Sequence, residues 1–146
     1  MRIYLDTSCL CRPIDDRSIH RNSVERLAII EFFAMARRGE LTLLISEVVL
    51  SEIRRTKDQT RHRKLESFTH VFHEVLELSD DAISRGTELW HRGFKTFDAL
   101  HVAVAEETAI DRLCTGDDRL RRKCQSQADI RVQVVSPLQL FQEFQR

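Results

Sequence analysis

The stretch from Thr96 to Asp118, TFDALHVAVAEETAIDRLCTGDD, places a predicted helix and a predicted strand between two carboxylates. Apolar residues recur at helical spacing after Asp98, and the short apolar run 110–115 ends at a glycine. We therefore predict a buried helix with Thr96 as its N-cap, then a strand with Asp117 just beyond it. In a layered α/β fold, a helix leading into a parallel strand begins at the edge where the strands end. Both carboxylates are thus expected at one edge of the sheet, where such folds bind ligands.

Each of these carboxylates also has an ordinary structural explanation. An acid in the first turn of a helix is favoured by the helix dipole, and an acid after a strand is common in turns. A functional site is indicated only if further carboxylates reach the same edge.

The length of 146 residues suits one domain spanning 1–146. With 42% hydrophobic and 32% charged residues, four Gly and two Pro, the composition is typical of a helix-rich globular protein. The net charge is zero, so any nucleic-acid contact must come from local basic patches. No apolar run approaches the length of a signal peptide or a membrane span, and we expect no membrane partner.

The four cysteines form no C-x-x-C pair. We expect free thiols and a cytoplasmic protein. A zinc site built from Cys9, Cys11 and some of the histidines is a weak alternative, because structural zinc sites have tighter ligand pairs.

Short apolar runs predict strands that alternate with segments of helical periodicity. This alternation favours a mostly parallel sheet with helices on both faces. The polar, aperiodic stretch from Cys11 to Asn22 predicts a loop over the carboxylate edge. Strands are expected at 2–5, 41–45, 75–78, 110–115 and 130–135, and helices at 24–38, after Ser46, at 80–90, after Thr96, at 119–123 and, for about one turn, from Pro137.

Two more carboxylates are expected at the same edge. Asp6 directly follows the first strand, and Glu52 lies about two turns into the helix that Ser46 caps, which is a weaker placement. Carboxylates held together repel one another and require protons or cations. Oxygen ligands suit Mg²⁺ or Mn²⁺, and such an ion can promote phosphodiester hydrolysis. The acidic set therefore favours a metal-dependent nuclease.

Basic segments follow three of these acids and are candidates for contacts with the phosphates of RNA. Their ordinary alternative is a solvated helix face or loop. The candidate backbone contacts are Arg12, Arg17, Arg54, Arg55 and Arg119.

Four motifs in order give the chain a resemblance to the PIN domain family, particularly to VapC-like toxins. They are Asp6-Thr7-Ser8 after a strand, Ser51-Glu52-Ile53 on a helix, the block from Asp98 to Ala103, and Thr115-Gly116-Asp117. The resemblance implies a three-layer α/β/α fold with about five strands. It also implies an Mg²⁺- or Mn²⁺-dependent endoribonuclease, often the toxin of a toxin–antitoxin pair and a homodimer.

Carried over by position, the resemblance assigns the metal and catalytic positions to Asp6, Glu52, Asp98 and Asp117. Ser8 and Thr115 match polar supporting positions. Asp118 leaves the last ligand position open, although the T-x-D register favours Asp117.

Two rivals stand beside this interpretation. The first is a catalytically inactive module that binds protein or RNA. The second is a phosphatase of the haloacid dehalogenase class, which would require a second Asp where this chain has Ser8.

Overall fold

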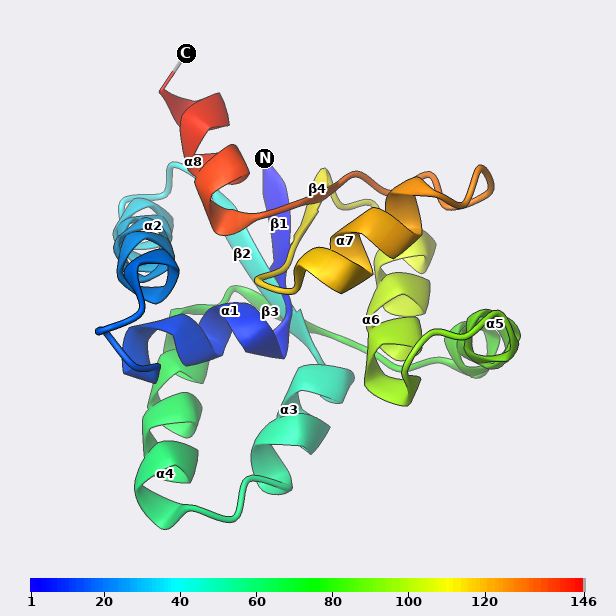
Figure 1. Ribbon diagram of the computed structural model, residues 1–146, viewed down its shortest axis with the longest axis horizontal. Helices are drawn as coiled ribbons and strands as arrows, with labels where there is room; N and C mark the ends of the chain where they lie inside the picture. Colours follow the sequence, from blue (N-terminus) through cyan, green and yellow to red (C-terminus); the bar gives the residue numbers. More distant parts are fainter. Residues whose placement is uncertain (146) are drawn as a thin grey trace.

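The computed structural model describes residues 1–145 and contains one five-stranded parallel sheet (Figure 1). The spatial order of its strands is β3-β2-β1-β4-β5, and all four neighbouring pairs are parallel. The mostly parallel sheet expected from the sequence is confirmed. The strands are β1 (Arg2–Leu5), β2 (Thr42–Ser46), β3 (Glu74–Leu76), β4 (Arg112–Cys114) and β5 (Val134–Val135).

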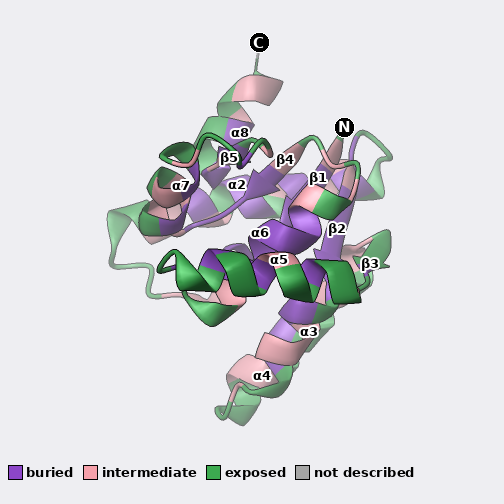
Figure 2. Ribbon diagram, turned by 90° about the vertical axis from the view of Figure 1, so that its right-hand side faces the viewer, coloured by how far each residue is buried: buried purple, intermediate pink, exposed green. Residues whose placement is uncertain are grey.

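Helices cover both faces of the sheet. In Figure 1, α2 and α8 lie on one side and α5 and α6 on the other, and Figure 2 shows α5 and α6 in front of the strands. This confirms the three-layer α/β/α architecture. The helices are α1 (Thr7–Cys11), α2 (His20–Arg37), α3 (Glu47–Arg54), α4 (Gln59–Phe68), α5 (Asp80–His91), α6 (Thr96–Glu107), α7 (Asp118–Gln125) and α8 (Pro137–Phe144), with 3₁₀ turns η1 (Arg12–Ile14) and η2 (Thr69–Val71).

The central strand β1 is buried because helices cover both of its faces. Ile3, Tyr4 and Leu5 are 0% exposed, as expected for a strand inside a parallel sheet. Its carboxyl end lies at the edge from which α3 and α4 project away from the sheet (Figure 1). None of the helices within residues 1–145 combines the length and hydropathy that a membrane span requires.

Local signals predict most element boundaries correctly. Gly39 follows the last turn of α2 with a φ of 76°, and the side chain of Ser46 accepts hydrogen bonds from Val48 and Val49 at the start of α3. The expected cap at Thr96 is wrong. Lys95 has the extended backbone of an N-cap, and Thr96 is the first residue of α6.

The loop expected from Cys11 to Asn22 is mostly wrong. Helix α1 ends at Cys11, η1 follows, and α2 begins at His20, so only residues 15–19 lack helix. The Asp6 carboxylate caps α1 by accepting from the Cys9 amide, and Pro13 lies in the first turn of η1. These short elements arise from capping, which leaves no apolar period in the sequence. The last strand is also shorter than expected and the last helix longer.

Candidate active site

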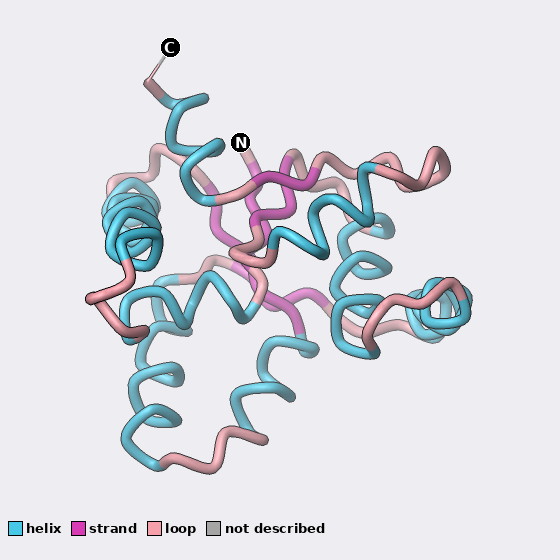
Figure 3. Tube along the Cα trace, viewed as in Figure 1, coloured by secondary structure: helices cyan, strands magenta, loops and turns pink. Residues whose placement is uncertain are grey.

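Three carboxylates from different elements lie at the carboxyl edge of the sheet. Asp6 ends β1, and Asp117 follows β4, which pairs directly with β1. Asp98 lies in the first turn of α6. Figure 3 shows the strands meeting loops and helices at this edge. The fold therefore brings together residues that are far apart in the sequence.

The Asp6 carboxylate is 3% exposed and held by hydrogen bonds to both oxygens. Ser8 Oγ donates to Oδ1 at 2.5 Å, and Thr115 Oγ1 donates to Oδ2 at 2.5 Å. The Gly116 amide then donates to Ser8 Oγ at 2.8 Å. Ser8 and Thr115 therefore orient Asp6, and they connect the end of β1 to the loop after β4.

Asp117 and Asp118 have different environments. Asp117 caps α7, because its Oδ1 accepts from the amides of Arg119 and Leu120. Asp118 instead pairs with Arg121 and Arg21, whose hydrogen bonds hold its pKa below the usual value. This ion pairing favours Asp117 as the acid that faces the edge.

Asp98 is half-buried, and its carboxylate accepts no hydrogen bond from residues 1–145. Burial and, after it, the negative charge of Asp117 raise its pKa to about 6, with a smaller contribution from Asp6. A half-buried acid whose pKa is also raised by neighbouring acids is a candidate functional group.

Glu52 reaches the edge through a polar contact that the sequence analysis did not predict. Its Oε1 accepts from Thr7 Oγ1 at 2.7 Å and lies 2.6 Å from His101 Nε2. Burial acts to raise the Glu52 pKa, but the hydrogen bonds from His101 and Thr7 lower it below its usual value. The one signal that could have identified His101 is its position three residues after Asp98, on a helix face that is otherwise apolar.

The loop before Asp117 is clamped by two arginines. Arg12 Nη2 and Arg21 Nη2 both donate to the Gly116 carbonyl oxygen, at 3.0 and 2.7 Å. Both guanidinium groups also contact Glu25 Oε1, and Glu25 is 3% exposed. Arg12 additionally donates to Asp15 at 2.8 Å.

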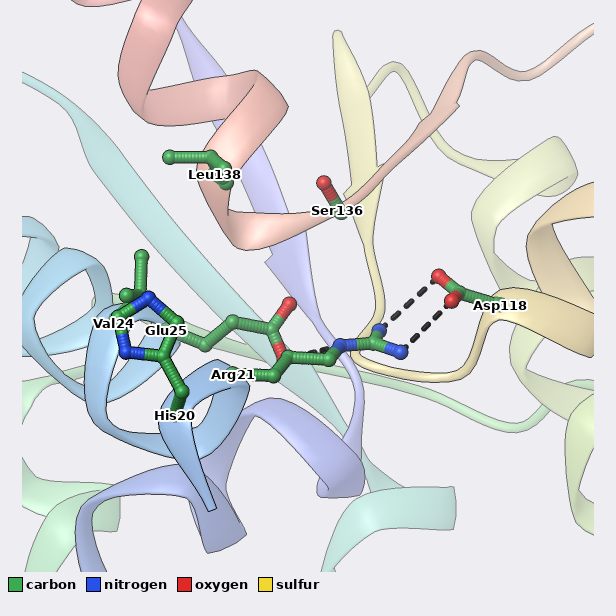
Figure 4. A pocket seen from close by; sticks show the side chains of 7 residues that line it. All are labelled: His20, Arg21, Val24, Glu25, Asp118, Ser136 and Leu138. Atoms are coloured by element: carbon green, nitrogen blue, oxygen red, sulfur yellow. Dashed lines mark hydrogen bonds and ion pairs between the residues drawn. The ribbon is translucent and has the colours of Figure 1, made fainter. Parts of the chain in front are cut away.

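Figure 4 shows a cavity of about 330 Å³ beside this clamp, with Arg21 directed toward Asp118. None of Asp6, Asp98 and Glu52 lines it. The cavity is therefore formed by the ion pairs that support the loop, and it is separate from the acidic edge.

The candidate RNA-contacting arginines divide into two groups. Arg12 was expected to meet phosphate; its guanidinium is 15% exposed and donates to three groups of the protein, so a phosphate would have to replace these contacts, and this expectation stays a prediction. The other four are exposed and form no ion pair within residues 1–145: Arg17, Arg54, Arg55 and Arg119. The guanidinium carbon of Arg55 lies 5.3 Å above the ring of Phe97, the residue before Asp98.

The acidic edge has the donor chemistry of a magnesium or manganese site, because it offers only carboxylate oxygens. Oδ2 of Asp117, Oε2 of Glu52 and both oxygens of Asp98 have no hydrogen-bond partner within residues 1–145. In the described part of the chain, no three His, Cys, Asp or Glu side chains already stand in a metal-binding arrangement. The residues thus fit a hard divalent ion by chemistry, although they do not form a complete cage.

The zinc alternative receives no support. All four cysteines are free thiols. Cys9 and Cys114 are 0% exposed, and burial raises the pKa of both thiols.

Comparisons with known proteins support the fold described above. A sequence model of the PIN domain family matches residues 3–125. None of the curated proteins matches the sequence significantly. Among solved structures, VapBC2 from Rickettsia felis, described as bound to a DNA fragment from the promoter, has 17% identity and a TM-score of 0.60, and the match covers 93% of this chain and 98% of that chain.

Two further solved structures are similar. VapC20 from Mycobacterium tuberculosis, described as a toxin that cleaves the sarcin-ricin loop, has 15% identity and a TM-score of 0.59, with 83% of this chain and 94% of that chain covered. VapBC-1 from nontypeable Haemophilus influenzae has 14% identity and a TM-score of 0.60, with 94% and 99% covered. At these identities the structural likeness shows the fold.

Replacing Asp98 by Asn should stabilise the metal-free protein at neutral pH. The folded-state pKa of about 6 lies above the unfolded value of about 3.9, so folding disfavours the ionised form. Below about pH 4 both states hold the proton and the gain should vanish. Between about pH 4 and 6 the gain should grow, reaching about 1 kcal/mol after allowance for solvent screening. Urea unfolding in excess chelator at several pH values measures this.

Asp80→Asn is the matched control, because it removes an exposed acid from the first turn of α5. It should give no gain at any pH. A D98N variant that is no more stable than wild type at pH 7.5 would show that Asp98 does not experience the other acids.

Replacing Gly116 by Ala should destabilise the fold by about 1–3 kcal/mol. The added Cβ would lie 2.7 Å from Arg12 Nη2, and Arg12 cannot easily move because it is also bound to Glu25 and Asp15. Urea unfolding of the metal-free variant measures the loss. An unchanged free energy of unfolding would mean that Arg12 can move aside without destabilising the fold.

Proposed function

This chain belongs to the PIN domain family, and we propose that it is a metal-dependent endoribonuclease that hydrolyses RNA phosphodiester bonds. The observation that carries the proposal is the convergence of Asp6, Asp98 and Asp117 on one sheet edge, where their charges and burial raise the pKa of Asp98. Such a charge arrangement is unfavourable without a cation and is suited to holding one.

Asp6, Asp98, Asp117 and Glu52 would hold the ion. When bound, Mg²⁺ or Mn²⁺ activates water and neutralises charge on the scissile phosphate. Ser8 and Thr115 orient the Asp6 carboxylate through their hydroxyl groups. The nucleophile is water, and the four carboxylates require no covalent intermediate with the protein.

The exposed arginines support a path for the RNA backbone. Arg54 and Arg55 lie where α3 ends, on the part of the fold that projects beyond the sheet edge (Figure 1). Arg55 stacks over Phe97 beside Asp98, so it would approach a phosphate that is bound at the acids. Arg17 and Arg119 would contact the backbone on the side of the Asp117 loop.

We further propose that the chain is the toxin of a toxin–antitoxin pair. Two of the similar solved structures are described as VapBC proteins, which supports an antitoxin partner. A homodimer and a single domain over 1–146 remain expectations from the sequence. Light scattering from the purified chain measures the oligomeric state.

An inactive binding module is the main rival. It shares the fold but predicts no metal-dependent cleavage. The phosphatase alternative has no support in the family match, and Ser8 binds Asp6 at the position where that class would carry a second acid.

Purified wild-type protein should cleave a mixed-sequence single-stranded RNA with Mn²⁺ and not with excess chelator. Asp98→Asn should reduce the rate by at least about 100-fold, because losing one charged ligand removes several kcal/mol of transition-state stabilisation. Gel analysis of end-labelled RNA measures both. Asp80→Asn is the control for loss of an acidic charge and should cleave like wild type.

Equal cleavage by wild type and D98N would show a contaminating nuclease or a wrong site. No cleavage by a wild type that binds Mn²⁺, when tested on structured and ribosomal RNA as well, would favour the binding module.

Neutralising both Arg54 and Arg55 should weaken RNA binding. In the D98N background, which leaves the RNA intact, R54Q/R55Q should lower the slope of log affinity against log salt concentration by about 1.4, or about 0.7 for each lost phosphate contact. Filter binding at several salt concentrations measures the slope. The pair R37Q/R131Q removes two exposed arginines elsewhere and should leave the slope unchanged. Equal slopes for both pairs would exclude this RNA path.

A further inference from the structure

A chain of buried polar side chains lies directly beneath the acidic edge. Tyr4 Oη is 2.6 Å from Ser46 Oγ and 2.7 Å from His101 Nδ1, and His101 Nε2 is 2.6 Å from Glu52 Oε1. Ser46 and Tyr4 are 0% exposed and His101 is 2% exposed. Buried polar groups are costly unless they are paired, so a chain of this kind requires an explanation.

The direction of every hydrogen bond in the chain follows from its two ends. Ser46 Oγ already accepts from the Val48 and Val49 amides, and a tyrosine hydroxyl keeps its proton at neutral pH because its ordinary pKa is about 10. Glu52 Oε1 accepts from Thr7 Oγ1, so its contact with His101 Nε2 requires a proton on that nitrogen. With Nδ1 accepting from the Tyr4 hydroxyl, Tyr4 accepts from Ser46, and every polar hydrogen has an acceptor.

The alternatives leave a group unsatisfied. A proton on both ring nitrogens would make Tyr4 donate to Ser46, and the Ser46 hydroxyl hydrogen would then have no acceptor among residues 1–145. A proton on Nδ1 alone would set the Nε2 lone pair against the Glu52 carboxylate. The packing therefore selects one tautomer of His101.

The hydrogen bonds of Ser46, Tyr4, His101 and Glu52 also join the elements that carry the acids. Tyr4 lies two residues before Asp6 on β1, so both side chains point to the same side of the sheet. His101 lies three residues after Asp98, on the same face of α6. Ser46 caps α3, which carries Glu52. One set of hydrogen bonds thus fixes β1, α3 and α6 relative to one another.

We propose that His101 is a positioning residue, whose Nε2–H, oriented by Tyr4 and Ser46, holds Oε1 of Glu52 and leaves Oε2 to face a divalent ion. This inference rests on the proposed function, because it gives Glu52 a role in holding the ion. A purely structural role for His101 would instead stabilise the fold without affecting ion binding.

The first test is Mn²⁺ binding to the full chain in the absence of RNA, measured by electron paramagnetic resonance of the free ion. His101→Leu puts an apolar side chain in place of the imidazole and so removes the Nε2–H donor. It should weaken Mn²⁺ binding by about 10–100-fold, as loss of a ligand's hydrogen-bond partner does. His101→Gln replaces an N–H donor near the position of Nε2 and should recover binding to within a few-fold of wild type.

The control is Ile29→Val, which shortens a buried apolar side chain on α2, a helix that carries none of the hydrogen-bonded residues Tyr4, Ser46, His101 and Glu52. It should lower thermal stability without changing Mn²⁺ affinity. Circular dichroism before each titration ensures that only folded protein is compared. If His101→Leu is unfolded, Tyr4→Phe replaces it, because it keeps the ring and removes the hydroxyl group that donates to Nδ1 and accepts from Ser46.

The outcomes separate the two proposals. If Asp98→Asn loses Mn²⁺ binding and the folded His101→Leu or Tyr4→Phe variant binds like wild type, the positioning role is wrong while the metal site stands. If wild type binds no Mn²⁺, the proposed function fails and the positioning role fails with it.

A second test does not depend on metal. Long-range ¹⁵N–¹H correlation spectra of metal-free wild type should show His101 with its proton on Nε2 and an unprotonated Nδ1. A proton on Nδ1 would overturn the proposed hydrogen-bond direction.

Discussion

Repulsion among carboxylates at one sheet edge is the constraint to which the surrounding polar groups respond. Because β1 and β4 are neighbouring parallel strands, the residues that follow them, Asp6 and Asp117, lie at the same edge of the sheet. The protein offsets their charge with hydroxyl groups on Asp6 and with the amino end of α7 on Asp117. Asp98 receives no such partner within residues 1–145, and its pKa shows the remaining repulsion. The fold thus concentrates uncompensated negative charge on one residue.

The sequence predicts those features whose cause is local. Apolar periods predict the parallel sheet and its covering helices, and single residues such as Gly39 and Ser46 mark helix ends because capping needs only their own backbone and the next turn. The contact of Arg12 with the Gly116 carbonyl could not be predicted, because the two residues are 104 positions apart in the sequence. His101 received no role for the same reason, since 49 residues separate it from Glu52. A charged or polar residue shows its type in the sequence, but its partner depends on the tertiary fold.

The net charge of zero conceals an uneven distribution of charge. Arg12 and Arg21 both form ion pairs with Glu25 and donate to the Gly116 carbonyl, and these contacts fix the backbone before Asp117. Arg54 and Arg55 lie on the projecting end of α3 and have no ion-pair partner within residues 1–145. In the described part of the chain, unpaired positive charge therefore lies beside the acidic edge at Arg54 and Arg55, as well as at exposed arginines elsewhere such as Arg37 and Arg131. A polyanion bound through a cation at the acids would meet these arginines without any global attraction to the protein.

Two separate sets of contacts hold the two sides of the acidic edge. The arginine clamp fixes the loop that carries Asp117, and the Ser46–Tyr4–His101 chain fixes Glu52 and the helix face that carries Asp98. A site that must bind an ion and a phosphate together requires its ligands to be placed before binding, because ordering them afterwards would consume binding energy. The Asp98 side chain is the least constrained of these acids, because its carboxylate accepts no hydrogen bond within residues 1–145. A cation held at the acidic edge would compete with a proton at Asp98, whose pKa is raised to about 6.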